Sequence, residues 1–389
     1  MSNQKTFIKM TPRDLLFCRD AKPMEQSWAG NGGLLPAPST LHGAVLAAYF
    51  RKYPAELNNQ THERNINSLT TQGPFLYQDG MPYFSTPLDV MPENKLLKLQ
   101  KITGYSDLPQ PLQYALFVDG KPSKKSVEPY ISLADLQKYL QGKEFELKPE
   151  FDFFIREARP GITIKSDSRT AQDGKYYFAE YLRLRENTSL IGTVDANDTS
   201  DLEKVFSENS SGMILGGQQS LVYVDTIPVL DLLPAPQISG RFVKYVLLTP
   251  AAWNKGWLPE FVDAQSQEWN VLLKSNDGPK PERRPGELRA AYRKRLAAAS
   301  NPIRARLIAA KTGKPIPISG WKLRGTASEN AKMTYLYIPA GSVYYFEAAD
   351  EQEAQRLATA LHGRAMSTMN GTAGYGLGVC GTFNIEDNK

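Results

Sequence analysis

The sequence predicts an α+β protein composed of two similar halves. Three observations support this prediction: a length of 389 residues, a hydrophobic content of 41%, and an order of predicted elements that occurs twice along the chain. A folded chain of this length usually divides into more than one core, so two domains are expected. The repeated order corresponds to two ferredoxin-like (RRM-like) βαββαβ domains, interrupted by long insertions and glycine-rich loops.

Residues 1–228 form the first predicted domain. The predicted elements of this half are, in chain order, a strand at 6–10, a helix at 40–53, a hairpin at 73–88, a helix at 133–140 within a loop-rich insertion, a strand at 175–185, a short helix at 201–207 and a strand at 220–226. The helix at 40–53 carries apolar residues at helical spacing, and Ser39 is its expected N-cap. The turn Asp79-Gly80 predicts the hairpin.

Residues 229–240 are the predicted linker, because the segment from Pro228 to Gly240 contains three prolines. The second predicted domain covers residues 241–389. Its predicted elements are a strand at 241–248, a helix at 286–299, a hairpin formed by 303–309 and 316–323, a strand at 334–347, a helix at 350–361 and a strand at 379–385. Each half therefore ends with a strand, a helix, a glycine-rich loop and a strand.

Glycine is concentrated near the C-terminus. Five glycines fall within eleven residues: Gly371, Gly374, Gly376, Gly378 and Gly381. Glycine allows positive φ and the close approach of another chain. Main-chain N–H groups in such a loop could donate to phosphate oxygens, and Tyr375 could stack on a base. The loop follows a predicted helix and precedes a strand, the reverse of the order at dinucleotide sites. A flexible connection is the alternative explanation.

Positive charge is concentrated in one region. The whole sequence has 46 Lys and Arg residues against 41 Asp and Glu residues, a net charge of +5. Between residues 280 and 311 there are ten basic residues and two acidic ones. Arg304 and Arg306 share one face of a predicted strand, and with residues 293–295 they could form a patch that follows phosphates. A docking surface for an acidic partner is the alternative.

Several classes of site are excluded by what the sequence lacks. Cys18 and Cys380 are too few for a disulfide framework or a zinc site. No GxSxG, HExxH or Walker A sequence is present, and no cofactor is expected. The chain shows no signal peptide and no apolar run of about 20 residues, so a cytoplasmic location without membrane attachment is expected.

Short segments along the whole chain resemble those of one protein family. They are LFCRDAKPM at 16–24, LPAPSTLHGA at 35–44, PGI at 160–162, RTA at 169–171, LGG at 215–217, ISGW at 318–321, GSVYYF at 341–346 and GYGLG at 374–378. In this order they resemble the CRISPR-associated RAMP proteins (repeat-associated mysterious proteins). Within that group the chain is most similar to the third subunit of the Cmr module, the type III-B interference complex. Met24 stands where the family usually has an aromatic residue.

The resemblance implies a structural, RNA-binding subunit and no catalytic activity. Such a subunit binds the 5′ tag of the CRISPR RNA (crRNA), and it contacts the large cyclase-domain subunit and the adjoining backbone RAMP subunit. Target RNA would be met only indirectly, because its cleavage belongs to the backbone subunit. The implied role is antiviral defence by a type III-B effector complex.

The residues predicted to contact RNA come from loops, a helix start and basic strands. They are Arg19, Lys22, Ser39, Thr40, His42, Arg159, Arg169, Gly216, Gly217, Arg304, Arg306, Gly374, Tyr375, Gly376 and Gly378. Ser39, Thr40 and His42 lie at a predicted helix N-terminus, where N–H groups and the helix dipole favour anions. Gly216 and Gly217 belong to a shorter glycine-rich segment, for which a β-bulge is the alternative.

Two other functions remain open from the sequence. Some RAMP relatives cleave CRISPR RNA with a histidine, and His42 would be the acid–base group of such an endoribonuclease. No partner for His42 can be identified, since His62 and His362 lie elsewhere in the sequence. The second alternative is a scaffold that binds proteins through its basic region and makes no contact with RNA.

Overall fold

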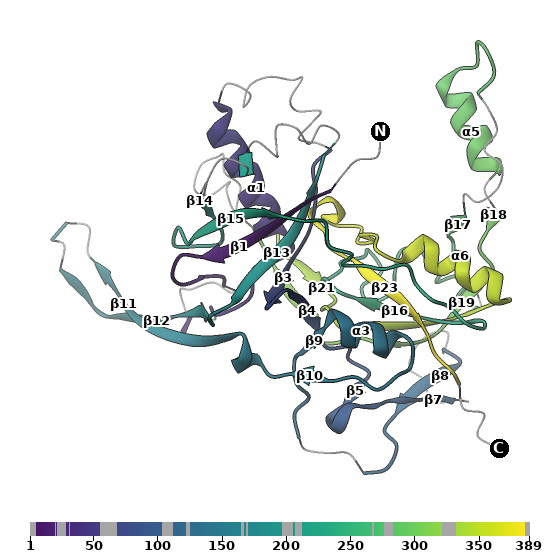
Figure 1. The fold of residues 1–389 in the computed structure, drawn as a ribbon, viewed down its shortest axis with the longest axis horizontal. Coiled ribbons are helices and arrows are strands. Elements are labelled where there is room, and N and C mark those ends of the chain that lie inside the picture. Colours follow the sequence, from purple (N-terminus) through teal and green to yellow (C-terminus); the bar gives the residue numbers. More distant parts are fainter. Residues whose placement is uncertain are drawn as a thin grey trace.

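The computed structural model describes residues 5–19, 21, 29–30, 32–54, 68–102, 112–121, 125–164, 167–168, 170–196, 205–206, 212–266, 268–275, 283–299, 301–320 and 332–385. Within these residues the protein is a mixed α/β fold of mostly antiparallel strands with few helices. Two sheets form the body of the molecule, and a long hairpin and one helix extend away from it (Figure 1).

The first sheet has eight strands in the order β10-β9-β4-β3-β13-β1-β15-β14. Their bounds are β1 (Thr6–Pro12), β3 (Thr70–Gln78), β4 (Met81–Ser85), β9 (Tyr130–Ser132), β10 (Leu147–Lys148), β13 (Thr188–Asp195), β14 (Gly212–Ile214) and β15 (Leu221–Ile227). Helix α1 (Pro38–Lys52) packs on this sheet, because Leu41, Val45 and Tyr49 are buried at helical spacing. The helix predicted at 40–53 is therefore confirmed, with its start two residues earlier.

The second sheet has four strands in the order β19-β22-β16-β23. Their bounds are β16 (Phe242–Leu247), β19 (Ala305–Lys311), β22 (Val343–Ala348) and β23 (Gly378–Thr382). Helix α6 (Glu351–Leu361) packs on this sheet through Ala354, Leu357 and Leu361, which have no exposed surface. Its N-cap Asp350 accepts a hydrogen bond from the amide of Glu353 at 2.9 Å. The helix predicted at 350–361 is confirmed.

The two sheets share one order of strands. When the strands of each half are counted along the chain, β1, β3, β13 and β15 lie in the order second, third, first, fourth, and so do β16, β19, β22 and β23. All neighbouring pairs among them are antiparallel. Helix α1 connects the first two strands of the first set, and α6 connects the last two strands of the second set.

An apolar cluster joins the two sheets. Phe7, Phe75 and Ile191 of the first sheet belong to the same buried cluster as Val246 and Tyr345 of the second. Burial of such side chains is the dominant favourable contribution to folding, so the halves are held together by a core. The segment 229–240, predicted as a linker, contains no helix or strand.

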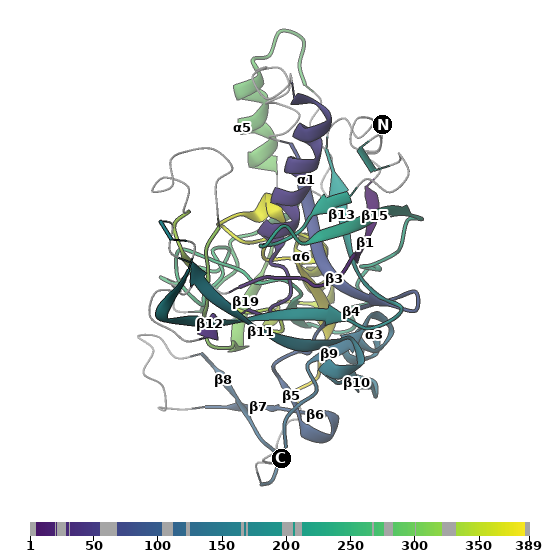
Figure 2. The same ribbon diagram turned by 90° about the vertical axis from the view of Figure 1, so that its left-hand side faces the viewer.

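Several shorter elements leave these sheets. Strands β11 (Phe154–Ile164) and β12 (Ala171–Leu184) form a hairpin that reaches away from the body, and β2 (Ala29–Gly30) pairs with it (Figures 1 and 2). The remaining elements are α3 (Leu133–Leu140), α5 (Arg289–Ala299), β5 (Val90–Met91), β6 (Lys95–Leu96), β7 (Lys98–Lys101), β8 (Tyr114–Phe117), β17 (Lys274–Ser275), β18 (Asn301–Pro302), β20 (Ile316–Ile318), β21 (Tyr335–Tyr337), η3 (Pro92–Asn94), η4 (Glu150–Asp152) and η5 (Gly371–Ala373). Only residues 205–206 of the predicted helix at 201–207 lie within the described residues.

Two predictions for the second half are wrong. The hairpin predicted between 303–309 and 316–323 does not form, because β19 pairs with β22 and β20 pairs with β21. Burial explains the difference: pairing with β22 places Leu307, which is 1% exposed, in the core of the second half. The strand predicted at 334–347 is two strands, β21 and β22, separated by a turn in which Gly341 has a φ of 85°.

A buried polar network joins the first-half insertion to the second sheet. Asp89, 2% exposed, accepts hydrogen bonds from the hydroxyl groups of Tyr139 on α3 and Tyr345 on β22. The Nζ of Lys244 on β16 donates to the carbonyl of Tyr139 at 2.6 Å and lies 3.6 Å from the centre of its ring. Burial lowers the pKa of Lys244 to about 8, and the negative charge of Asp89 opposes this shift. The network therefore connects elements of both halves at a site without water-exposed charge.

The variant Lys244→Met tests this burial. Between the folded pKa of about 8 and the ordinary lysine value of 10.5, the unfolded state binds more protons than the folded state. The free energy of unfolding should therefore rise with pH in that window. We expect a rise of about 1.5 kcal/mol between about pH 8 and about pH 9.5 in the wild type, and its loss in Lys244→Met. Urea unfolding at a series of pH values measures it.

Lys138→Met is the matched control, because Lys138 lies on α3 with its side chain 51% exposed. This variant should keep the wild-type rise. An equal rise of the free energy of unfolding with pH in Lys244→Met and in the wild type would contradict the conclusion that Lys244 is buried and has a lowered pKa.

Candidate functional site

Helix α1 begins beside the C-terminal glycine-rich segment. Its first residue is Pro38, whose fixed φ suits a helix start, and its N-cap Ala37 makes no side-chain hydrogen bond. The prediction that Ser39 is the N-cap is therefore wrong. The Oγ of Ser39 instead lies 2.8 Å from the hydroxyl oxygen of Tyr375. The predicted site residues Ser39 and Tyr375 thus meet although 336 positions separate them.

Close packing explains the glycines of this segment. Gly374 has a φ of 88°, and a Cβ atom there would collide with the carbonyl oxygen of Thr71 on β3. Gly376 has a φ of 75°, and a Cβ atom there would collide with the backbone of Ser367. Gly378 is buried and pairs with Leu247 within the second sheet. Gly374 and Gly376 are therefore needed where main chains of the protein itself approach one another, whereas a Cβ atom on Gly378 would collide with the ring of Tyr245.

The predicted mechanism of RNA binding by this segment is wrong. The amide of Gly374 donates to the carbonyl of Gly371 at 2.8 Å, and the amide of Gly376 donates to the carbonyl of Pro250 at 2.7 Å. Neither amide is available to a phosphate. The ring of Tyr375 has no exposed surface, and its centre lies 4.6 Å from that of Tyr337, so it cannot stack on a base. Burial raises the pKa of Tyr375 to about 12.

His42 lies in the first part of α1 and is partly buried. Its Nδ1 is 3.3 Å from the Oγ1 of Thr71. Burial and, to a smaller extent, the positive charge of Lys332 lower the pKa of His42 to about 4. The ring is therefore neutral at neutral pH and adds no positive charge for a phosphate. Thr71 and Lys332 are distant in sequence, so no local pattern indicated either. Thr40, also half-buried, donates its amide to Ala37.

A second group of predicted residues lies at the exposed turn between β14 and β15. The amide of Gly217 donates to the carbonyl of Phe17 at 2.8 Å, and a Cβ atom on Gly216 would lie 2.7 Å from the same oxygen. The turn is thus held against the segment that ends in Arg19. Both Gly217 and Arg19 are exposed. Lys22 lies outside the described residues.

Arg159 lies on the protruding hairpin. Its Nη2 is 2.8 Å from Glu157, and its guanidinium lies 5.6 Å from the ring centre of Tyr181. The side chain is 46% exposed, so it is held on the hairpin surface by neighbours. Arg169, which was also predicted to contact RNA, lies outside the described residues. The hairpin carries apolar side chains as well, since Ile162 is 56% exposed and Phe178 is 38% exposed.

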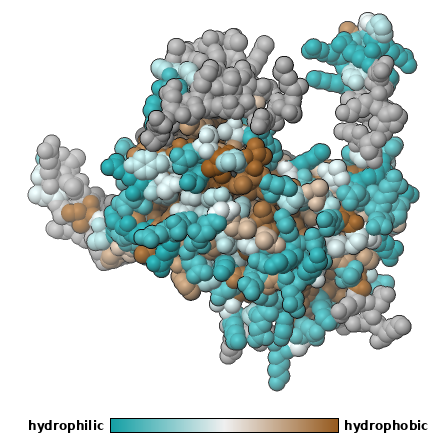
Figure 3. Space-filling view, in the orientation of Figure 1, coloured by the Kyte–Doolittle hydropathy of each residue, from teal (hydrophilic) through white to brown (hydrophobic). Residues whose placement is uncertain are grey.

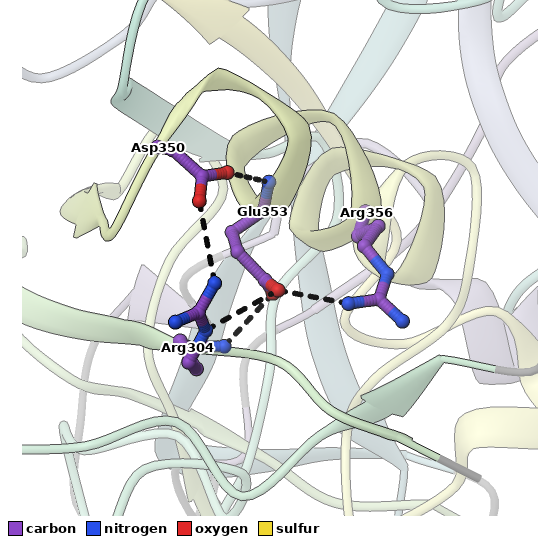
Figure 4. Close-up of polar contacts among 4 residues, drawn as sticks. All are labelled: Arg304, Asp350, Glu353 and Arg356. Atoms are coloured by element: carbon purple, nitrogen blue, oxygen red, sulfur yellow. Dashed lines mark hydrogen bonds and ion pairs between the residues drawn. The ribbon is translucent and has the colours of Figure 1, made fainter.

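Arg304 and Arg306 line an open cleft of about 500 Å³ at the edge of the second sheet. The Nη2 of Arg306 is 2.8 Å from Glu347. Arg304 contacts Asp350 at 3.3 Å and Glu353 at 3.5 Å, and Glu353 also binds Arg356 at 2.8 Å (Figure 4). Carboxylates therefore offset the charge of these arginines. The prediction of one continuous basic patch with residues 293–295 is wrong, because α5 stands away from this cleft (Figure 1).

Two kinds of feature are absent from the described ranges. In that part of the chain no group of three His, Cys, Asp or Glu side chains is placed to hold a metal ion. None of the described helices has both the length and the apolar character that crossing a bilayer requires.

A family model for a CRISPR-associated protein matches residues 8–383. This span includes nearly all of both sheets and places the chain in the class of CRISPR-associated proteins. The chain belongs to the Cas_Cmr3 family, which confirms the resemblance to the third subunit of the Cmr module. No curated protein sequence matches it significantly.

Solved structures similar to this chain come from type III CRISPR complexes. A chain of the type III-B Cmr-beta complex bound to cognate target RNA is 18% identical, with a TM-score of 0.46 and coverage of 88% of this chain and 86% of that chain. A chain of the Csm3-Csm4 subcomplex of the type III-A interference complex is 10% identical, with a TM-score of 0.42 and coverage of 87% and 92%. These TM-scores are below 0.5, so the family assignment depends on the family model.

Gly376→Ala tests whether the glycine-rich segment is a packing element. The new methyl group would meet the backbone of Ser367 at a positive φ, so we expect a loss of about 3 kcal/mol in the free energy of unfolding. Gly371→Ala is the control, because a Cβ atom there meets its nearest neighbour, the oxygen of Ala365, at an ordinary 3.5 Å. It should change stability by less than about 0.5 kcal/mol. Urea unfolding measures both variants, and equal stability of the two would contradict the packing role.

Proposed function

We propose that this chain is the non-catalytic subunit that binds the 5′ tag of the crRNA in a type III-B Cmr effector complex. In this role it joins the large cyclase-domain subunit to the backbone RAMP subunit and meets target RNA only indirectly. The observation that carries the proposal is the match of the Cas_Cmr3 family model to residues 8–383. A reducing, cytoplasmic setting is part of the proposal and is consistent with two buried free cysteines, Cys18 and Cys380.

The proposal includes two ferredoxin-like domains, 1–228 and 241–389. The common strand order of the two sheets supports it, because second-third-first-fourth with antiparallel neighbours is the βαββαβ arrangement. The crossover between β16 and β19 differs from that arrangement. It contains α5 and irregular chain in place of a helix packed on the sheet. Insertions of this kind often carry binding residues, so this crossover could contact a partner that the sheets do not reach.

The tag would bind at exposed groups near the first sheet. Arg19 and Gly217 are held together by the contact of the β14–β15 turn with Phe17, and both face solvent. An arginine at an exposed position is suited to phosphate oxygens, and the Gly217 amide, which is bonded to the carbonyl of Phe17, holds the turn beside it. The glycine-rich C-terminal segment supports this surface from inside, because it fixes the start of α1 through Tyr375 and Ser39.

Contacts with neighbouring subunits would use the β11–β12 hairpin. It extends from the body and exposes Ile155, Ile162 and Phe178, and Phe151 near its base is 64% exposed (Figures 1 and 2). Apolar side chains on an extended hairpin gain free energy when a partner covers them. The hairpin therefore supports the bridging part of the proposal.

Arg19→Gln tests the tag site. In filter-binding titrations with the assembled complex and with the purified chain, we expect about fivefold weaker binding of RNA carrying the repeat-derived 5′ tag. The preference over the same RNA without the tag should shrink as well. Lys143→Gln removes the same charge from an exposed position after α3 and should change neither value. Wild-type protein that binds both RNAs equally would contradict the proposal.

The absence of catalysis is tested with repeat RNA. The purified chain, incubated with this RNA in EDTA, should leave it intact, because His42 is neutral and hydrogen-bonded to Thr71. Metal-independent cleavage that disappears in His42→Ala would instead support the endoribonuclease alternative.

A further inference from the structure

Residues 283–299 form an arm, called the basic arm here, made of helix α5 and the turn before it. The arm projects from the edge of the second half and stands apart from both sheets (Figure 1). It holds six Arg and Lys residues against one Glu, which equals the net charge of +5 of the whole chain. The rest of the sequence is therefore neutral on balance, and the excess positive charge of the protein lies on a projecting helix.

The side chains of the arm that the structure describes are mostly exposed. Arg289, Ala290, Ala291 and Arg293 are exposed, and Leu288 is 77% exposed. The space-filling view shows the outer end of the arm as mostly hydrophilic (Figure 3). An isolated helix of 11 residues is marginal in water, because most helical stability in proteins comes from packing. A binding partner would supply the contacts that the body does not.

Arg289 and Arg293 are two unpaired charges on the described part of α5. Within the part of the chain that the structure describes, neither makes an ion pair or a side-chain hydrogen bond. The one acidic residue, Glu287, is already engaged by Arg295 at 2.9 Å. Hydrogen bonds from Arg295 and from the Arg284 amide lower the pKa of Glu287 to about 2. The carboxylate thus stays charged and bound to Arg295, and it does not neutralise Arg289 or Arg293.

The spacing of these two arginines suits a polymer that carries a regular series of phosphate groups. Residues four apart lie on one face of a helix, with Cβ atoms about 6 Å apart. Guanidinium groups bind phosphate in bidentate geometry, and they are weakly hydrated for a cation. By contrast, Arg304 and Arg306 are close to carboxylates of their own chain. Arg289 and Arg293 therefore differ from these two arginines, because they make no ion pair within the described part of the chain.

We propose that the basic arm binds the phosphate backbone of RNA at a place separate from the 5′-tag site. RNA is favoured over an acidic protein because a protein interface needs an apolar centre. Among the described side chains of the arm, Leu288 is the one large hydrophobic residue that is strongly exposed. Contact through phosphates carries no sequence information, so the arm adds affinity without adding preference for the tag.

The double variant Arg289→Gln/Arg293→Gln tests the arm in the full chain. The probe is a single-stranded polyuridine RNA of about 30 nucleotides, titrated by fluorescence anisotropy at several KCl concentrations. Losing two phosphate contacts should reduce the slope of log K against log [KCl] by about 1.4 and weaken binding at low salt about tenfold. The control Lys95→Gln/Lys125→Gln removes two positive charges that are paired with Glu93 at the β5–β6 turn. It should keep the wild-type slope.

Four outcomes would overturn the proposal. The first is an unchanged slope in the arm variant, and the second is no binding of polyuridine by the wild type at low salt. The third is an equal loss in the control variant. The fourth is binding of poly-L-glutamate that depends on Arg289 and Arg293 while RNA binding does not, which would make the arm a protein-docking site. The proposed function is tested separately, because the preference for tagged RNA should survive in the arm variant.

Discussion

The close approach of the C-terminal glycine-rich segment to β3 and α1 is the constraint on which the arrangement of the two halves depends. Gly374 can lie against the carbonyl of Thr71 because it has no side chain, and this contact brings the Tyr375 hydroxyl to Ser39. A larger residue at Gly374 would push the segment before the last strand away from the first half. The start of α1, and the surface around it, therefore depend on residues near the opposite end of the chain.

The buried network of Asp89, Tyr139, Tyr345 and Lys244 also holds the two halves together, but it does so through hydrogen bonds. An apolar cluster holds the sheets together without directional preference, whereas hydrogen bonds require particular donors and acceptors to meet. Placing an ammonium group in a buried position is unfavourable, as the lowered pKa of Lys244 shows. The carboxylate of Asp89 and the carbonyl of Tyr139 offset part of that penalty only when α3 is docked on the second sheet.

With these contacts made inside the molecule, the groups left for partners lie on its projections. The β11–β12 hairpin presents apolar side chains, the β14–β15 turn presents main chain beside Arg19, and α5 presents unpaired arginines. The three surfaces differ in chemistry, as the separate contacts proposed for this member of the Cas_Cmr3 family require. The edge of the second sheet is not one of these surfaces, because carboxylates offset the charges of Arg304 and Arg306 there.

The sequence alone determined the family, the mixed α/β class, and the helices at 133–140 and 350–361, because periodicity, caps and motif order are local properties. It also located the basic region. It could not determine whether a glycine is exposed to a ligand or packed against its own chain, since both need the same missing side chain. Tyr375, Gly374 and Gly376 were therefore assigned to RNA when they belong to the core. Only the tertiary structure decided which arginines are paired and which are free, because Glu347 and Glu353 come from later elements that the fold brings to Arg306 and Arg304.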